Sequence, residues 1–338
     1  MIDIDGSHGE GGGQILRTSI ALSAVTGEDV RISNIRANRP RPGLAPSHVT
    51  SVEAVAAICD AEVDGLFAGS KAIEFRPRQL TGGDFEFDVG TAGSVSLIVQ
   101  SCLLPASLSK SRVTLVARGG TDVKWSPPID FMRLAHVPML AKFGPVCHLD
   151  IESRGFYPEG GGVIRAEVSP VSRLTPVSLK DRGKVEAVTG IAFAQNLPEH
   201  VIERMRHAAM KRLIGQAEVK IESQLSRGPS TGAGIVMAAE CRETVIAESA
   251  LGERGVKAEL LGEGCANDLI ETIASGATVD EHMLDQIIPY MGLAGPGCAV
   301  LAEEMTGHAE TNLWVTEKFL GKKFSTSKKG NLIELRTI

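Results

Sequence analysis

The sequence has few aromatic residues and lacks the short motifs of several common enzyme classes. Phenylalanine, tryptophan and tyrosine make up 4% of the 338 residues, which argues against an aromatic platform for single-stranded nucleic acid. No Walker lysine motif, no G-x-S-x-G elbow and no H-E-x-x-H helix occurs. The glycines of residues 6–13 do not follow the order G-x-G-x-x-G either. Standard nucleotide-binding folds, α/β-hydrolases and zinc proteases are therefore not supported.

Two further absences concern metal sites and membranes. The six cysteines are scattered without a C-x-x-C pair, so the spacing does not support a structural zinc site. Cys59 and Cys102 fall in apolar helical patterns and are expected to be buried thiols. The chain has no basic, apolar leader and no apolar run of about 18–20 residues. We therefore expect a cytoplasmic protein with no membrane partner.

The formal net charge is −6, which argues against a broad basic face for duplex nucleic acid. A local basic groove stays compatible with this charge. Any contact with nucleic acid is expected to be small and directed at an end of the strand.

The most distinctive stretch is the amino-terminal run Gly6-Ser-His-Gly-Glu10-Gly-Gly-Gly13. Glycines that precede a helix let the backbone approach a ligand and present free N–H groups to an anion. Glu10 is unexpected beside phosphate, unless a divalent cation lies between the two. The alternative is a tight turn with an exposed glutamate. The spacing recurs in Gly155-Phe-Tyr-Pro-Glu159-Gly-Gly-Gly162, which suggests duplicated structural units.

Hydrophobic periodicity predicts an α+β architecture with α/β-type layers, in which one βαβαββ block is used repeatedly. The first block is expected to end with strands at 72–76 and 85–89. Helices are expected at 14–26, 47–61, 94–105, 128–143, 198–214, 256–275, 280–290 and 311–320. Further strands are expected at 29–35, 112–117, 147–153, 163–168, 185–194, 219–224, 234–240, 244–249, 299–302, 324–327 and 332–336.

The pattern changes near Arg182–Lys184 and returns at Ala277. Residues 1–181 and 277–338 are therefore predicted to form a large domain of three repeats. Residues 182–276 are predicted to form a small α/β domain inserted within the third repeat.

Two other segments could carry chemistry. Arg36, Arg39 and Arg41 lie in a stiff loop rich in proline, where guanidinium groups could grip phosphate; a solvated basic loop is the alternative. His308 is expected in a loop before the helix at 311–320. A neutral imidazole there could attack phosphorus, although a loop histidine can also have no such role.

Four separated motifs, spanning nearly the whole chain, closely resemble the RNA 3′-terminal phosphate cyclase family. They are Gly6–Arg17, Ile35–Leu44, Gly119–Asp122 and Gly155–Gly162. The resemblance implies three βαβαββ units with an inserted α/β domain, and a distant relation to enolpyruvyl transferases. It also implies an activity in which ATP adenylylates a histidine and the AMP passes to an RNA 3′-phosphate. The neighbouring 2′-hydroxyl then closes a 2′,3′-cyclic phosphate and releases AMP.

The resemblance also implies roles for individual residues. His308 matches the nucleophile, and Glu10 matches a carboxylate that contacts a divalent cation such as Mg²⁺ or Mn²⁺. The phosphate positions match Arg17, Arg39 and His48. The ATP-contacting positions match Gln100, His282, Met283, Leu284, Asp285 and Gln286. Many family members have tyrosine where this chain has His282, which leaves the packing of adenine open.

This hypothesis makes RNA with a 3′-phosphate end the partner and leaves the oligomeric state open, with a homodimer as the candidate assembly. It requires His308 to lie against the amino-terminal glycine turn. One alternative is a non-catalytic RNA-binding or ribosome-assembly factor on the same scaffold, against which His308 and Glu10 argue. Another is an enolpyruvyl-type transferase, which would act without a nucleotide.

Overall fold

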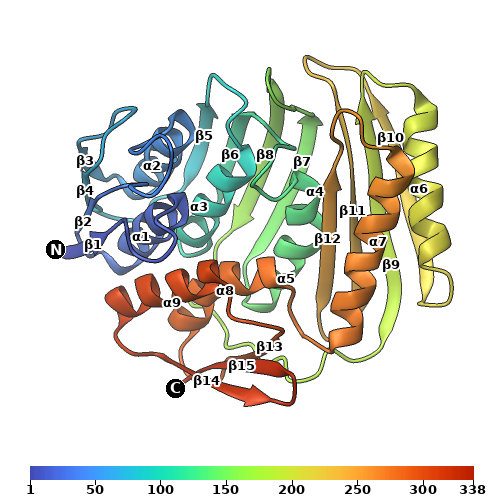
Figure 1. Ribbon diagram of the computed structural model, residues 1–338. Coiled ribbons are helices and arrows are strands. Elements are labelled where there is room, and N and C mark those ends of the chain that lie inside the picture. Colours follow the sequence, from blue (N-terminus) through green and yellow to red (C-terminus); the bar gives the residue numbers. More distant parts are fainter.

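The computed structural model describes residues 1–338 and has the α+β architecture that the sequence predicts. Several small sheets lie around the outside, and most helices lie between them (Figure 1). None of these helices is both long and apolar enough to cross a membrane.

The first unit forms a four-stranded sheet of order β1-β2-β4-β3, in which β1 and β2 are parallel. Its elements are β1 (Ile2–Asp5), α1 (Gly13–Thr26), β2 (Val30–Ser33), α2 (Pro46–Cys59), β3 (Glu62–Asp64) and β4 (Ile73–Arg76). The sequence patterns missed β3. Only three residues long, it is too short for its alternation to stand out.

The second unit repeats this topology in the order β5-β6-β8-β7, again with its first two strands parallel. Its elements are β5 (Gly83–Asp88), α3 (Val95–Ser107), β6 (Val113–Gly119), α4 (Ile129–Phe131), η1 (Met132–His136), α5 (Val137–Lys142), β7 (Val146–Ser153) and β8 (Gly162–Ser169). The strand expected at 85–89 was wrongly assigned to the end of the first unit. It pairs with β6, so it begins the second.

The third unit has a three-stranded sheet of order β13-β15-β14. Its elements are α8 (Glu281–Ala294), β13 (Ala299–Ala302), α9 (Gly307–Leu320), β14 (Phe324–Lys329) and β15 (Leu332–Thr337). Ser178 pairs in parallel with Ala299, and the N–H of Leu179 donates to the carbonyl of Ala299 at 2.7 Å. The extended segment at 177–179 thus takes the place of β1 and β5.

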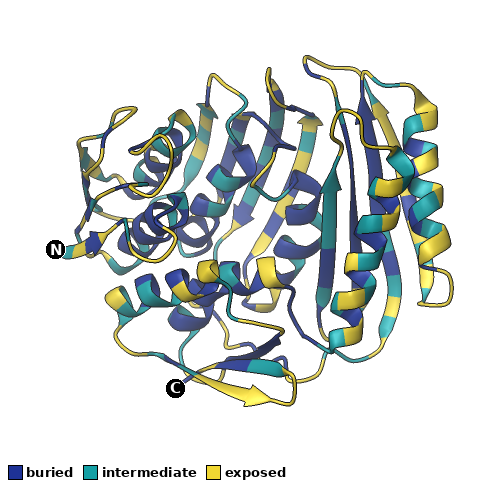
Figure 2. Cartoon of the chain, viewed as in Figure 1, coloured by how far each residue is buried: buried dark blue, intermediate teal, exposed yellow.

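The segment between 179 and α8 forms a separate sheet of order β10-β9-β11-β12. Its elements are β9 (Val185–Gln195), α6 (Glu199–Arg212), β10 (Glu218–Ser226), β11 (Gly232–Cys241), β12 (Val245–Leu251) and α7 (Ala258–Ser275). Helices α6 and α7 cover one face of this sheet, and their outer sides are exposed (Figures 1 and 2).

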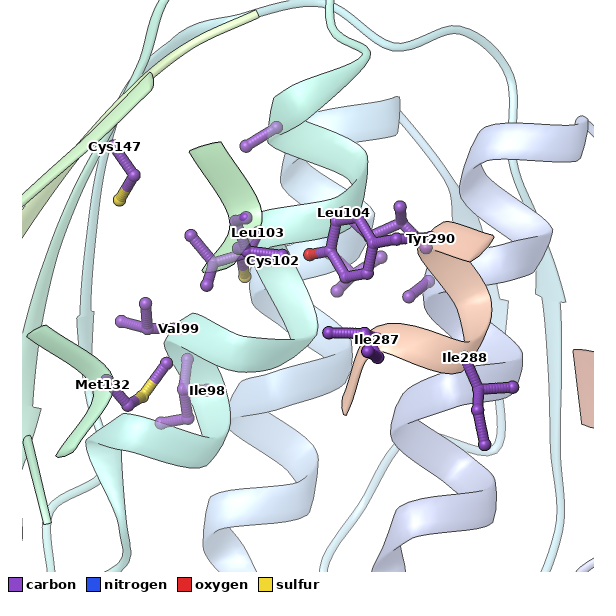
Figure 3. Packing of buried hydrophobic residues seen from close by; sticks show 14 of the residues in the cluster. Ile98, Val99, Cys102, Leu103, Leu104, Met132, Cys147, Ile287, Ile288 and Tyr290 are labelled. Atoms are coloured by element: carbon purple, nitrogen blue, oxygen red, sulfur yellow. The ribbon is translucent and has the colours of Figure 1, made fainter. Parts of the chain in front are cut away.

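Two hydrophobic clusters stabilise the fold. The larger has 64 buried residues and includes α3, α8 and the helical segment at 129–142, with Cys102, Met132, Ile287 and Tyr290 close together (Figure 3). The smaller has 17 residues, all between α6, α7 and their sheet. The opposite face of that sheet contributes Phe193 and Val236 to the larger cluster. The division into 1–181 with 277–338 and 182–276 therefore stays a prediction. Cys59 and Cys102 are buried free thiols, as expected.

The two glycine-rich runs lie at different places in their units. Residues 6–12 connect β1 to α1, whereas 155–161 connect β7 to β8. The structural units are repeated, but the two glycine motifs do not occupy equivalent positions in their units. The second run instead contacts the sheet of β9 to β12, which we call the inserted sheet. The N–H of Phe156 donates to Ser230 Oγ at 2.7 Å, and Ser230 Oγ donates to the carbonyl of Gly160 at 3.0 Å.

Arg154, beside this second run, is the charged centre of the same junction. Its side chain is 2% exposed and reaches the buried carboxylates of Asp122, at 3.1 Å, and Asp130, at 2.5 Å. The guanidinium also contacts Gln224 of the inserted sheet and lies 3.8 Å from the centre of the Phe193 ring. Arg154 thus pairs with two buried carboxylates between the second unit and the inserted sheet, and Arg133 also reaches Asp130, at 2.7 Å.

We expect Arg154→Ala to destabilise the protein by about 3–5 kcal/mol, because it leaves the buried carboxylate of Asp122 without a counter-charge and that of Asp130 with Arg133 alone. Urea unfolding measures this change as a lower midpoint. Arg204→Ala is the control, because Arg204 pairs with Glu259 where both side chains are exposed. Equal, small effects of the two substitutions would contradict a stabilising role for Arg154.

Candidate active site

The turn between β1 and α1 exposes backbone N–H groups. Gly9 and Gly11 have φ angles of +55° and +59°, in the left-handed region that favours glycine. Helix α1 begins after Gly12 without a side-chain cap, so donors of its first turn stay free. The ring of His8 stacks on Trp314 of α9 with centroids 3.9 Å apart, which fixes this turn against the third unit.

His308 lies in the first turn of α9, not in a loop as the sequence analysis expected. The helix begins at Gly307 rather than at 311, because Thr306 caps it: Thr306 Oγ1 accepts from the N–H of Ala309 at 3.1 Å. Helix α2 likewise begins earlier than expected, with Pro46 at its first position. Nδ1 of His48 accepts a hydrogen bond from the N–H of Ala45, at 3.2 Å.

Gln14 fixes the orientation of the His308 ring. Its Nε2 donates to Asp285 Oδ2 at 3.0 Å, so its Oε1 faces the Nδ1 of His308 and forms a short hydrogen bond with it. An amide oxygen only accepts, so Nδ1 of the neutral ring carries the proton. The lone pair of His308 is therefore on Nε2.

Glu10 faces that lone pair. Its Oε2 lies 3.2 Å from Nε2 of His308 and 3.8 Å from Nη2 of Arg39. The ring thus lies against the amino-terminal glycine turn, as the sequence hypothesis required. Two electron-rich atoms this close favour a cation or a proton between them. Burial nevertheless lowers the pKa of His308, with Glu10 opposing this effect and Arg17 adding to it, so the ring is mainly neutral at pH 7.

Arg17 and His48 line the other side of the turn. Burial lowers the pKa of Arg17 to about 10, and Asp285 opposes that shift. Arg17 forms no hydrogen bond or ion pair within the protein, so its donors are available to a ligand. Burial, with Arg17 and Arg36 nearby, lowers the pKa of His48 to about 3. His48 is therefore neutral, and because its Nδ1 accepts, its Nε2–H is a donor beside Gly13.

Asp285 shares this environment. Burial raises the pKa of its carboxyl to about 7, while Arg17 and Gln14 act in the opposite direction. Its backbone carbonyl accepts from Asn312 Nδ2 of α9 at 2.7 Å. Asp285 therefore holds α1 and α9 together through Gln14 and Asn312.

The remaining predicted residues of α8 differ in accessibility. The side chain of His282 is 60% exposed and its ring meets the edge of Phe131 at 6.2 Å. Met283 and Leu284 are fully buried in the larger core, so only their backbone could contact a nucleotide. Gln286 donates to the carbonyl of His282 at 2.9 Å, and its Oε1 is buried without a partner. Gln100 lies on α3 and makes no contact with His308 or Glu10.

The first turns of α1, α2, α3, α4, α8 and α9 form a closed ring of contacts. His48 of α2 packs on Gly13 of α1 so closely that a Cβ on this glycine would lie 2.1 Å from Nε2 of His48. Ser47 packs in the same way on Gly93, just before α3, where a Cβ would lie 2.9 Å from the Cβ of Ser47. Ser96 Oγ donates to the carbonyl of Pro127 at 2.7 Å. The Phe131–His282 contact joins α4 to α8, and Gln14 closes the circle through its hydrogen bonds to Asp285 and His308. Helix N-termini carry partial positive charge, so the ring attracts anions.

Sequence reasoning missed Gln14, Thr18 and Asn312 as a connected set. Thr18 Oγ1 donates to Asn312 Oδ1 at 2.6 Å inside the α1–α9 contact, one turn beyond Gln14. Gln14 and Thr18 are polar residues four apart on a buried helix face. Such residues need partners, and this was the available signal. The partners themselves lie 294 residues away.

Comparison with known proteins identifies close relatives. A family model described as RNA 3′-terminal phosphate cyclase matches residues 8–326. A Methanopyrus kandleri protein named RNA 3′-terminal phosphate cyclase is 46% identical over 328 residues, covering 95% of this chain and 93% of the relative. Proteins of the same name from Methanosarcina barkeri and Pyrococcus abyssi are 44% and 43% identical, with 99% and 96% of this chain covered and 99% and 94% of the relatives.

We expect Gln14→Met to change the tautomer of His308. Without the amide acceptor, the neutral ring gains most by protonating Nε2 and donating to Glu10. Long-range ¹H–¹⁵N spectra of histidine-labelled protein above pH 7 distinguish the two tautomers. His48 is an internal control, because its Nδ1 accepts from Ala45 in either protein. An Nδ1–H tautomer that persists in the variant would contradict the orienting role of Gln14.

Proposed function

The chain belongs to the RNA 3′-terminal phosphate cyclase family, and on this premise we propose that it uses ATP to convert an RNA 3′-terminal phosphate into a 2′,3′-cyclic phosphodiester. The observation that carries the proposal is the arrangement of His308. Its Nδ1 is occupied by Gln14, and its Nε2 lies half-exposed beside Glu10. This presents one nitrogen lone pair at the glycine turn, as nucleophilic attack on phosphorus requires.

In the first step, Nε2 of His308 attacks the α-phosphorus of ATP. A nitrogen–phosphorus bond forms, the bond to the β-phosphate oxygen breaks, and pyrophosphate leaves with its electron pair. The ring becomes cationic, and Gln14 Oε1 stabilises the Nδ1–H that remains. The lowered pKa of His308 keeps the ring unprotonated beforehand, which favours attack.

In the second step, an oxygen of the RNA 3′-phosphate attacks the phosphorus of the histidine-bound AMP. The nitrogen–phosphorus bond breaks, and the ring leaves as neutral imidazole. In the third step, the 2′-hydroxyl attacks the 3′-phosphorus, loses its proton to solvent and displaces AMP. The hydroxyl is already held beside the activated phosphate, so this closure requires little more than positioning.

Arg17, Arg39, His48 and the free N–H groups of α1 are the proposed phosphate donors. Gln100 and the segment 282–286 are the proposed ATP contacts, with His282 offering a smaller ring surface than tyrosine would. We propose a 3′-phosphorylated RNA end as the specific partner. The homodimer and the cytoplasmic location stay predictions from the sequence.

A divalent cation, Mg²⁺ or Mn²⁺, fits the position of Glu10. One carboxylate with substrate phosphates is a common way of binding Mg²⁺, and Glu10 Oε2 faces a lone pair on Nε2 that needs a positive neighbour. No set of three acidic, histidine or cysteine side chains gathers anywhere in the chain to hold a metal, so the substrate phosphates would have to supply the other ligands at Glu10. When bound, the ion would neutralise charge on the phosphates.

The main test is covalent labelling with ATP carrying ³²P at the α-phosphorus. We expect a label that survives denaturation, and a loss of about a thousand-fold or more in His308→Ala because no other group replaces the nucleophile. His207→Ala, on the exposed side of α6, is the control and keeps the label. Unlabelled wild-type protein would refute the proposal and favour a non-catalytic RNA-binding factor. Full labelling of His308→Ala would refute His308 as the nucleophile.

A second prediction concerns Glu10. We expect Glu10→Gln to slow labelling by about 10- to 1000-fold, because charge stabilisation at the phosphates is lost. The Mn²⁺ concentration that gives half the maximal rate should also rise. Glu310→Gln changes an exposed carboxylate in the first turn of α9, the helix that carries His308, and serves as the control. An unchanged metal dependence in Glu10→Gln would remove Glu10 from the metal site.

A further inference from the structure

One tryptophan and one tyrosine side chain project into solvent without a partner. The chain has two tryptophans and two tyrosines. Trp314 stacks on His8 and Tyr290 is buried in the core, whereas Trp125 is 96% exposed and Tyr157 is 77% exposed. A protein this poor in aromatic residues leaves half of its largest amphipathic rings in water. Such rings usually mark a contact surface.

The two rings belong to loops that adjoin each other. One loop follows β6 and the other precedes β8, and these strands pair through Gly119 and Gly162. The N–H of Thr121 donates to the carbonyl of Gly155 at 2.8 Å, and the N–H of Gly155 donates to Thr121 Oγ1 at 2.9 Å. Trp125 and Tyr157 therefore extend from one hydrogen-bonded loop pair.

The loop that bears Trp125 is held in a defined shape. Trp125 has a φ of +62°, a left-handed conformation that is costly for an aromatic residue. Ser126 Oγ donates to the carbonyl of Val123 at 2.9 Å, and Lys124 pairs with Glu253 at 2.9 Å. A cavity of about 350 Å³ lies beside the ring, between this loop and Ser249 and Leu251 of β12. The ring thus has a preformed space next to it.

The two loops pack next to the candidate active site. Cβ of Ser47, the neighbour of His48, lies 2.9 Å from the position that a Cβ on Gly93 would take. Ala92, beside Gly93, in turn packs on the buried backbone of Gly160, where a Cβ would lie 2.8 Å from the Ala92 Cα. On the other side, Pro127 accepts from Ser96 within the ring of helix N-termini. A strand whose terminal phosphate is held by Arg17 and His48 can therefore continue over these loops.

We propose that Trp125 and Tyr157 stack on bases of the single-stranded RNA that precede the reacting 3′ end. This inference rests on the proposed function. Every base offers a π-face, so the contact extends the site along the strand without selecting its sequence. Two rings can contact only a few bases, so this is a short surface and not the extended platform that an aromatic content of 4% argues against. Contact with a protein partner would require a broader apolar patch than two rings on polar loops.

The test compares Trp125→Asn and Tyr157→Ser with the wild type, because asparagine tolerates the left-handed conformation. Cyclisation is measured on a 3′-phosphorylated decanucleotide and on a dinucleotide. We expect the KM for the decanucleotide to rise about 5- to 100-fold in each variant. The KM for the dinucleotide should stay unchanged. Labelling by ATP alone should not change. Trp125→Phe should retain most of the affinity, and Ile214→Ser, at the opposite end of the inserted sheet, should retain all of it.

A decanucleotide with abasic sites before its last two nucleotides separates base stacking from other effects. We expect the abasic RNA to bind the wild type as weakly as the intact RNA binds the variants. The abasic RNA should bind the variants no more weakly than it binds the wild type. The proposal would be overturned if the variants kept the wild-type KM for the decanucleotide, or if their KM for ATP rose instead of their KM for the decanucleotide.

Binding can also be followed without catalysis, by quenching of tryptophan fluorescence with the decanucleotide. Quenching that disappears in Trp125→Asn would support the stacking surface even if no protein–AMP formed. Trp125→Asn keeps Trp314, which stacks on His8 of the glycine turn, so the quenching is measured in a Trp314→Phe background. Quenching that persists there in wild-type amount after Trp125→Asn would count against the surface while leaving the proposed chemistry intact.

Discussion

The contact between Gln14 and His308 is the interaction on which the rest of the site depends. It joins the first turn of α1 to the first turn of α9, which lie 294 residues apart in the sequence. Asp285 and Asn312 complete a polar chain across an otherwise apolar helix interface. Because buried polar groups are costly when unpaired, this chain fixes the register of α1 against α9. The same register places Nε2 of His308 beside Glu10. One set of contacts therefore both stabilises the helix interface and positions the imidazole.

A protein with a net charge of −6 can still bind polyanions if positive potential is concentrated locally. Here it comes from the ring of helix N-termini, the uncapped turn of α1 and the guanidinium of Arg17, which has no partner in the protein. Burial of Arg17 and His48 limits screening by water. The distribution of charge, rather than its sum, thus matches a ligand held by its phosphates.

Several features could be predicted from the sequence because their causes are local. The helices follow apolar periodicity, and the glycine turn follows from backbone freedom. Strand β5 was placed in the wrong unit because its partner β6 lies beyond a whole helix. The start of α9 was misjudged because its cap, Thr306, precedes a glycine and a histidine that favour loops. The burial of Met283 and Leu284 depends on the packing of α8 between two units, which no short pattern reveals.

The second glycine run shows how one backbone device acquires a different role through its surroundings. Near Glu10, the glycines leave room for Asn38, Arg39, His48 and Thr311, which all crowd the positions of absent Cβ atoms. At Gly155 and Gly162 the space is filled by backbone of the paired loop, and no histidine or arginine points at Glu159. The close approach therefore brings side chains against the glycines in one place and forms a structural junction in the other. Because that junction fixes the loops of Trp125 and Tyr157 relative to the ring of helix N-termini, its rigidity also determines where a strand leaving the site can lie.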